Sequence, residues 1–222
     1  MKKTAIYSSL LLSTVILASV GGTKALAAPQ GEMSTDTHIE FSGHTPNPNP
    51  EGDLNLIWVP TTFEFGNHDV ADNATASTSY EMQNPLPKYT VVEDKRTDAH
   101  GQWTVKAASS ELKSGSNSLA GAQINITNTA VKQYTPTDNT VVPESTGAIV
   151  DAPGSWSNVT VSSNIQLAAG GAAQEVMTAT GSAVENGKYA AEFGNVTLQV
   201  PQSQAKEGNY TGTVTWTLED TL

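Results

Sequence analysis

The residues of this chain best suited to chemistry are its four histidines and the carboxylates near them. His38, Glu40 and His44 lie close together, and His68 is followed directly by Asp69. Imidazole and carboxylate groups commonly bind metal ions, but these residues have no recognised ligand spacing such as H-E-x-x-H. We therefore expect a solvated polar segment here and no metal site.

The sequence also lacks the motifs of common enzymes. It contains many serines, but it has no G-x-S-x-G elbow and no glycine-rich phosphate loop. It has no cysteine, which excludes a thiol nucleophile, a cysteine-ligated metal and a lipoprotein anchor. The Asp and Asn residues of Asp69–Ser79 do not have the spacing of a calcium loop. We expect no catalytic residue, no cofactor and no enzymatic activity.

Two tryptophan-containing segments have the clearest pattern in the chain. In Tyr210–Leu222, the side chains of Val214, Trp216 and Leu218 alternate with threonines, as in a half-buried strand. The upstream segment Asn195–Pro201 alternates in the same way and closes on a proline, which cannot donate to a sheet. The two runs predict an antiparallel hairpin with one shared apolar face.

A second pair of runs lies earlier in the chain. Lys88–Arg96 and Gln102–Ala107 are separated by turn residues at Thr97–Gly101, so they predict a proximal hairpin. Trp103 and Val105 share a face of the second run, as Trp216 and Leu218 do at the other end of the chain. We expect at least one of the two indoles to be buried in a core.

Asp94 and Arg96 lie just ahead of the first of these tryptophans. They are two positions apart in a predicted strand, so their side chains share a face and can form an ion pair. An exposed pair would contribute only about 0–1 kcal/mol, whereas a semi-buried pair would fix the strand register.

These motifs resemble the WxL domain of surface proteins from low-GC Gram-positive bacteria. The distal motif is matched by Trp216, Thr217 and Leu218, and the proximal motif by Trp103, Thr104 and Val105, with Val105 where leucine is usual. The chain departs from the family pattern at Gln102, which separates Gly101 from the tryptophan, and in lacking a terminal proline. The resemblance implies that these six residues form the wall-binding motifs, with Asp94 and Arg96 as a supporting pair.

The resemblance also implies function and partners. It implies non-covalent attachment to the cell wall by binding peptidoglycan. It further implies association with a membrane-anchored WxL-interacting protein and with other WxL proteins. An alternative is an adhesin that binds host matrix proteins or carbohydrate. Another is a structural subunit that is retained only through a protein partner.

The ends of the chain predict export followed by retention outside the cell. Residues 1–27 combine a basic start, an apolar run over Ile6–Val20 and a small-residue cleavage site at Ala25–Ala27, as in a secretory signal peptide. Residues 28–50 are polar and contain Pro46, Pro48 and Pro50, which predicts an extended linker. The sequence shows no sortase motif and no apolar C-terminal span, so we expect non-covalent retention at the surface.

The net charge limits the possible partners. The formal charge is −11, and removing Lys2, Lys3 and Lys24 with the signal peptide would take away three positive charges and leave −14. Nucleic acid and anionic lipid both need a cationic surface, so neither is expected as a partner. Specific contacts, rather than bulk attraction, would also be needed to bind a wall that carries anionic polymers.

The remaining sequence predicts an all-β domain over residues 51–222. Short alternating runs are separated by turn residues, and no segment has the pattern of an amphipathic helix. The expected strands are 54–59, 88–96, 102–107, 122–127, 158–161, 165–167, 174–180, 188–193, 195–201 and 210–222. About eight to ten short strands with long polar loops indicate an antiparallel β-sandwich.

Overall fold

The computed structural model describes six ranges of the chain, and these are all-β. The ranges are 29–36, 52–69, 76–96, 102–138, 141–181 and 184–220. They contain fourteen strands and the two short 3₁₀ helices η1 (Gly154–Trp156) and η2 (Gln202–Gln204). No helix in these ranges is long and apolar enough to cross a membrane. The predicted signal peptide lies outside the described residues.

The first sheet carries both tryptophan motifs. Its strands are β1 (Pro29–Asp36), β14 (Thr213–Asp220), β5 (Trp103–Ser109), β12 (Gln174–Ala179) and β10 (Val159–Val161), in that spatial order. All of their pairings are antiparallel. The residues that form the two motifs therefore lie on neighbouring strands in the middle of one sheet.

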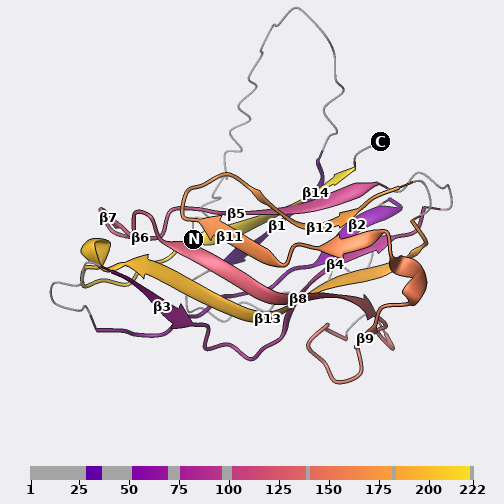
Figure 1. Ribbon diagram of the computed structural model, residues 1–222, viewed down its shortest axis with the longest axis horizontal. Helices are drawn as coiled ribbons and strands as arrows, with labels where there is room; N and C mark the ends of the chain where they lie inside the picture. The colour runs from indigo at the N-terminus through magenta and orange to yellow at the C-terminus, as the bar shows by residue number, and fades with distance from the viewer. Residues whose placement is uncertain are drawn as a thin grey trace, which may run out of the picture.

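The second sheet is organised around a single long strand. Its order is β11 (Asn164–Ala168), β8 (Gln123–Tyr134), β13 (Gly187–Pro201), β4 (Lys88–Asp94) and β2 (Leu54–Trp58). Three shorter pairings complete the structure: β3 (Ser77–Glu81) with β13, β9 (Ile149–Asp151) with β8, and β6 (Lys113–Ser114) with β7 (Asn117–Ser118). In Figure 1 the long β8 and β13 lie side by side in one layer, and β5 and β14 lie in the other.

The main core fills the space between the two sheets. The largest fully buried side chains include Trp103, Trp216, Tyr189, Phe193 and Ile124. A smaller apolar cluster, built around Trp58, Tyr89, Val91 and Tyr134, includes partly buried Val141, Val142 and Ile149 at its margin. The sandwich predicted from the sequence is confirmed, although it has more strands than expected. The additional strands β1, β3, β6, β7 and β9 are short or polar and lack the alternation that marks core strands.

Both predicted hairpins are wrong in their pairing. β13 lies in one sheet and β14 in the other, and β4 and β5 are divided between the sheets in the same way. The apolar faces were predicted correctly, because the aliphatics of β13 and those of β14 are buried in one core cluster. The connection over 202–212 is longer than the usual two to five residues of a hairpin loop. That length carries the chain across the sandwich instead of back along its own sheet.

The predicted linker also needs correction. Residues 29–36 form β1, which pairs antiparallel with β14 from Pro29 opposite Glu219 to Asp36 opposite Thr213. An edge strand is held largely by main-chain hydrogen bonds, so a polar sequence without alternation can still occupy it. The proline-rich part of the predicted linker, over 37–50, lies outside the described residues.

Candidate functional site

The two W-x-L motifs pair directly with each other. In the antiparallel register of β5 and β14, Leu218 lies opposite Val105 and Trp216 lies opposite Ala107. Because side chains alternate across a strand, both tryptophans and both aliphatic motif residues point to the same face of the sheet. The two motifs lie far apart in the sequence, but in the structure they lie side by side on paired strands.

Trp216 is a core residue of β14. Its side chain is 0% exposed, and its ring stacks on Phe193 of the opposite sheet with centroids 5.9 Å apart and an interplanar angle of 17°. Phe193 is itself fully buried. The indole thus joins the centre of one sheet to the centre of the other, which confirms the expectation of a buried tryptophan.

Trp103 occupies an equivalent place at the start of β5. It is also 0% exposed, and its ring lies 5.6 Å from that of Tyr189, which in turn lies 4.1 Å from Trp156. The Tyr189 hydroxyl donates to the Glu185 carbonyl oxygen, and burial raises the pKa of this tyrosine, as do the carboxylates of Asp94 and Glu185. Tyr189 therefore remains a neutral donor at physiological pH.

The threonines of the motifs face away from this core. Thr217 lies opposite Lys106, and Thr104 lies opposite Glu219. On the same outer face the Lys106 ammonium forms an ion pair of 2.7 Å with the Glu219 carboxylate, both about one-third exposed. The motif thus has an apolar side that supports the fold and a polar side that carries one cross-strand ion pair.

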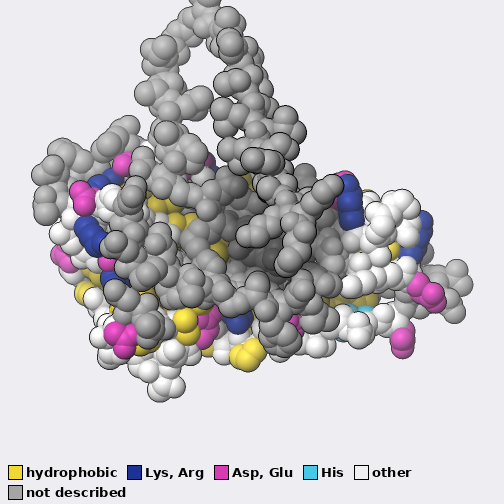
Figure 2. Space-filling view, turned by 180° about the vertical axis from the view of Figure 1, so that it is seen from behind, with side chains coloured by type: hydrophobic (Ala, Val, Ile, Leu, Met, Phe, Trp, Pro, Cys, Tyr) yellow, Lys and Arg dark blue, Asp and Glu magenta, His cyan; other side chains and the backbone are white. Residues whose placement is uncertain are grey.

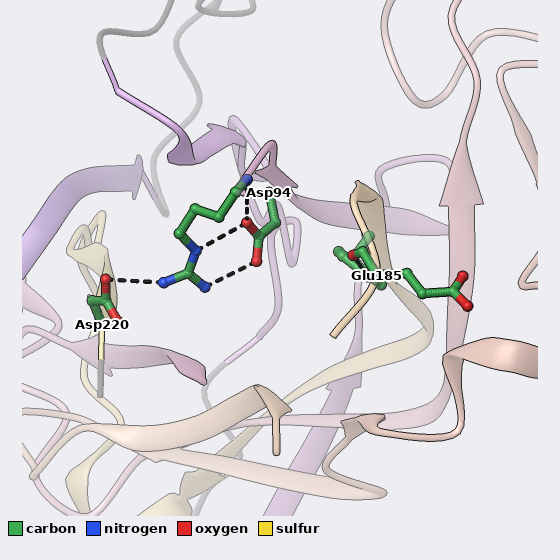
Figure 3. Close-up of polar contacts among 5 residues, drawn as sticks. Asp94, Glu185 and Asp220 are labelled. Carbon is green, nitrogen blue, oxygen red and sulfur yellow. Dashed lines mark hydrogen bonds and ion pairs between the residues drawn. The ribbon is translucent and has the colours of Figure 1, made fainter. Parts of the chain in front are cut away.

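A cluster of ion pairs connects the two sheets next to the two motifs. The Arg96 guanidinium donates to both carboxylate oxygens of Asp94, at 3.0 and 2.9 Å, and its third nitrogen donates to Asp220 at 3.0 Å. Figure 3 shows Asp94 and Asp220 on either side of the guanidinium, with Glu185 further away. Hydrogen bonding to Asp94 is the main cause that raises the pKa of Arg96, so the cation is permanent. We call Asp94, Arg96 and Asp220 the Arg96 cluster.

The Arg96 cluster connects elements that no local pattern relates. Asp94 ends β4 in one sheet, and Asp220 ends β14 in the other, opposite Trp103. The predicted pairing of Asp94 with Arg96 is confirmed, but Arg96 lies just past the end of β4. Asp220 was not predicted as a member of this pair. The only available signal was an acidic residue two places after the distal motif, which is too common to be read as a partner.

In the described ranges, no group of three His, Asp or Glu side chains is placed to hold a metal ion. His38, Glu40 and His44 lie outside those ranges. Among the described side chains visible in Figure 2, acidic and basic groups are interspersed and form no broad basic patch. His68 and Asp69 line a cleft at the other end of the sandwich.

The fold and the motifs define an all-β domain whose two sheets are joined around a paired set of buried W-x-L motifs. Residues 28–221 match the family described as WxL domain surface cell wall-binding, and the chain belongs to that family. Neither the curated proteins nor the solved structures contain a match. Family membership places the protein at the cell surface, where its domain binds the cell wall non-covalently.

Proposed function

We propose that this protein is exported and binds peptidoglycan through surface groups that the paired W-x-L motifs hold in place. We further propose that it works in a complex with a membrane-anchored WxL-interacting protein and other WxL proteins, without catalysing a reaction. The family match supports wall binding, and the resemblance of the motifs suggests the partners.

One observation supports a positioning role for the motifs. Both indoles are completely inaccessible to solvent, and Val105 and Leu218 between them are equally buried. A side chain without accessible surface cannot touch a large insoluble polymer unless the domain opens. Buried anchors can instead keep neighbouring exposed groups in a fixed geometry. The motifs therefore act on wall binding through the fold.

Pelleting with purified wall sacculi tests this proposal. The secreted protein should pellet with sacculi on its own, and Trp216→Phe should retain binding because a large ring still fills the core. Thr217→Ala, on the outer face of the same strand, is a matched control that leaves the core intact. Each variant is also melted, so that lost folding can be separated from a lost contact.

Three results would contradict parts of the proposal. Absence of binding to sacculi by the native protein would overturn wall binding and favour the adhesin. Binding only after a membrane-anchored partner is added would favour the structural subunit. Loss of binding by Trp216→Phe with an unchanged melting temperature would make the indole a direct contact.

A further inference from the structure

A cleft lies at the end of the sandwich away from the Arg96 cluster. Gly187 at the start of β13 lies opposite Asp94, whereas Val200 near the end of the same strand lines the cleft. The cleft has a volume of about 210 Å³, and its lining includes Tyr80 of β3 together with Leu112 and Leu119, which flank β6 and β7. Its walls come from residues 64–69, from Tyr80 and from residues 205–210. Three segments distant in sequence therefore meet here.

One wall of the cleft is aromatic and held in place. The rings of His68 and Tyr80 are stacked, with centroids 3.9 Å apart and an interplanar angle of 24°. The His68 ring nitrogen bonds the Phe65 carbonyl oxygen, and the Tyr80 hydroxyl accepts a bond of 3.0 Å from the buried Gln202 amide. The stack is fixed at both of its rings, so a ligand meets an already ordered surface.

The loop that carries His68 is itself hydrogen-bonded to the segment that follows β3. The Glu64 amide donates to the Asn84 side chain at 2.6 Å, and the Gln83 amide donates to the Glu64 carbonyl oxygen at 2.7 Å. Gly66 has a positive φ of 77°, and an added Cβ would lie 1.9 Å from the Gln83 side chain. The positive φ is a left-handed conformation that favours glycine, whereas the flexible Gln83 side chain could move aside.

The floor of the cleft is aliphatic, and its rim is polar. Leu112, Leu119, Leu198 and Val200 form the floor and are buried in the main core. The rim provides carboxylates, amides and one ammonium group, from Glu64, Asn67, Asp69, Asn209 and Lys206. Tyr210 also lines the cleft, and its buried hydroxyl has no hydrogen-bond partner among the described residues.

We propose that this cleft binds one ring of a neutral N-acylated sugar. The aromatic wall suits the C–H face of the ring, the aliphatic floor suits the acyl methyl group, and the rim suits hydroxyl and amide groups. Two carboxylates against one ammonium disfavour an anionic ligand. The volume lies below the range of about 300–1,000 Å³ usual for larger ligands, as expected for a single ring.

This inference rests on the proposed wall binding, because a wall glycan is the source of N-acyl sugar that such a protein meets. Glycans of a host carry the same chemistry, so the source has to be separated by experiment. The buried motifs would then help to hold the cleft in shape. β14 begins at Thr213, shortly after Tyr210, so the strand that carries Trp216 also anchors one wall of the cleft.

The test is a titration of the secreted protein with the tetramer of N-acetylglucosamine, followed by NMR chemical shifts, with the glucose tetramer as the non-acylated control. Binding of the first alone, with shifts centred on the cleft, is the expected result. His68→Ala removes an exposed ring from the wall and should weaken binding roughly threefold to tenfold. Asn209→Trp fills the cleft and should abolish binding, whereas Gln166→Ala, an exposed site on β11, should change nothing.

The outcomes separate this inference from the proposed function. If sacculi are bound and the tetramer competes with them, both stand and the wall is the source of the ligand. If sacculi are bound equally by Asn209→Trp and the native protein, both with native melting curves, the cleft is overturned and wall binding stands. If the tetramer is bound in the cleft but sacculi are not, wall binding fails and a host glycan is the ligand. Equal binding of the two tetramers would overturn the selection of an N-acyl sugar.

Discussion

Trp216 shows how a motif residue can matter for binding without touching a ligand. The Trp216→Ala variant loses a fully buried indole and its stacking on Phe193. Large-to-small changes of this kind cost about 3–5 kcal/mol, a large share of the typical stability of a domain. We expect chemical denaturation to show that loss, and Trp103→Ala to show a similar one.

Wall binding should fall in step with folding in both alanine variants. The informative comparison is at a temperature where the variant is still folded, because there a supporting residue should leave binding intact. The Trp103 indole nitrogen has no hydrogen-bond partner in the described ranges, so Trp103→Phe removes no bond and should be milder than Trp103→Ala. Equal losses from Phe and Ala at this position would contradict a packing role.

The ion pairs of Arg96 lead to a second prediction about a single residue. Its Asp94 partner is only 3% exposed, so Arg96→Met leaves a carboxylate buried without its cation. Removing one member of such a pair costs about 2–4 kcal/mol, which denaturation can measure. The matched control is Lys113→Met, because the ion pair of Lys113 with Glu111 is more than half exposed on both sides. That change should stay within about 0.5 kcal/mol, and equal effects would argue against a structural Arg96 cluster.

At the scale of elements, β1 protects the strand that carries the distal motif. Without residues 29–36, β14 becomes the edge of its sheet and exposes a row of unpaired main-chain groups. We expect a variant that lacks β1 to melt at a lower temperature and to self-associate, which light scattering on a sizing column would detect. A peptide with the sequence of Pro29–Asp36 should reverse part of the effect. An unchanged melt and a monomeric profile would show that β1 does not cover this edge.

The strands also show which parts of the fold could be predicted from the sequence. Alternation along Val214, Trp216 and Leu218 correctly identified the core-facing side, because a period of two follows directly from strand geometry. It could not say whether Val196 was a neighbour in the same sheet or faced β14 across the core. Sheet pairing depends on which distant segments bury each other, and both arrangements present the same alternating pattern.

The cleft was beyond prediction for a different reason. Its walls come from the polar loops around His68 and Tyr210 and from Tyr80 of the polar strand β3, and none of these segments has a hydrophobic period. His68 and Asp69 were noticed for their chemistry and were assigned to a solvated segment. Their proximity to Tyr210 depends on the long connection before β14. Residues on such connections have to be located by the fold as a whole.

At the scale of the whole molecule, the excess of negative charge predicts how wall binding responds to salt. A protein with a formal charge of −11 gains nothing from bulk attraction to an anionic wall. Three basic side chains close to the proximal motif in the sequence are already paired: Lys95 with Glu93 at 2.9 Å, Arg96 in its cluster, and Lys106 with Glu219 at 2.7 Å. Within the described ranges, these three side chains therefore form no unpaired cationic patch beside the W-x-L motifs.

Sacculus binding should therefore change little between about 0.01 and 0.15 M salt, although the screening length falls from about 30 to about 8 Å over that range. Pelleting at several salt concentrations, with sacculi that retain their anionic polymers and with sacculi stripped of them, measures this directly. Stripped sacculi should bind at least as well, because removing the polymers removes a repulsion. A steep loss with salt, confined to unstripped sacculi, would mean that Lys95, Arg96 and Lys106 leave their carboxylate partners to bind the wall polymer, and specific recognition of a neutral group would no longer explain attachment.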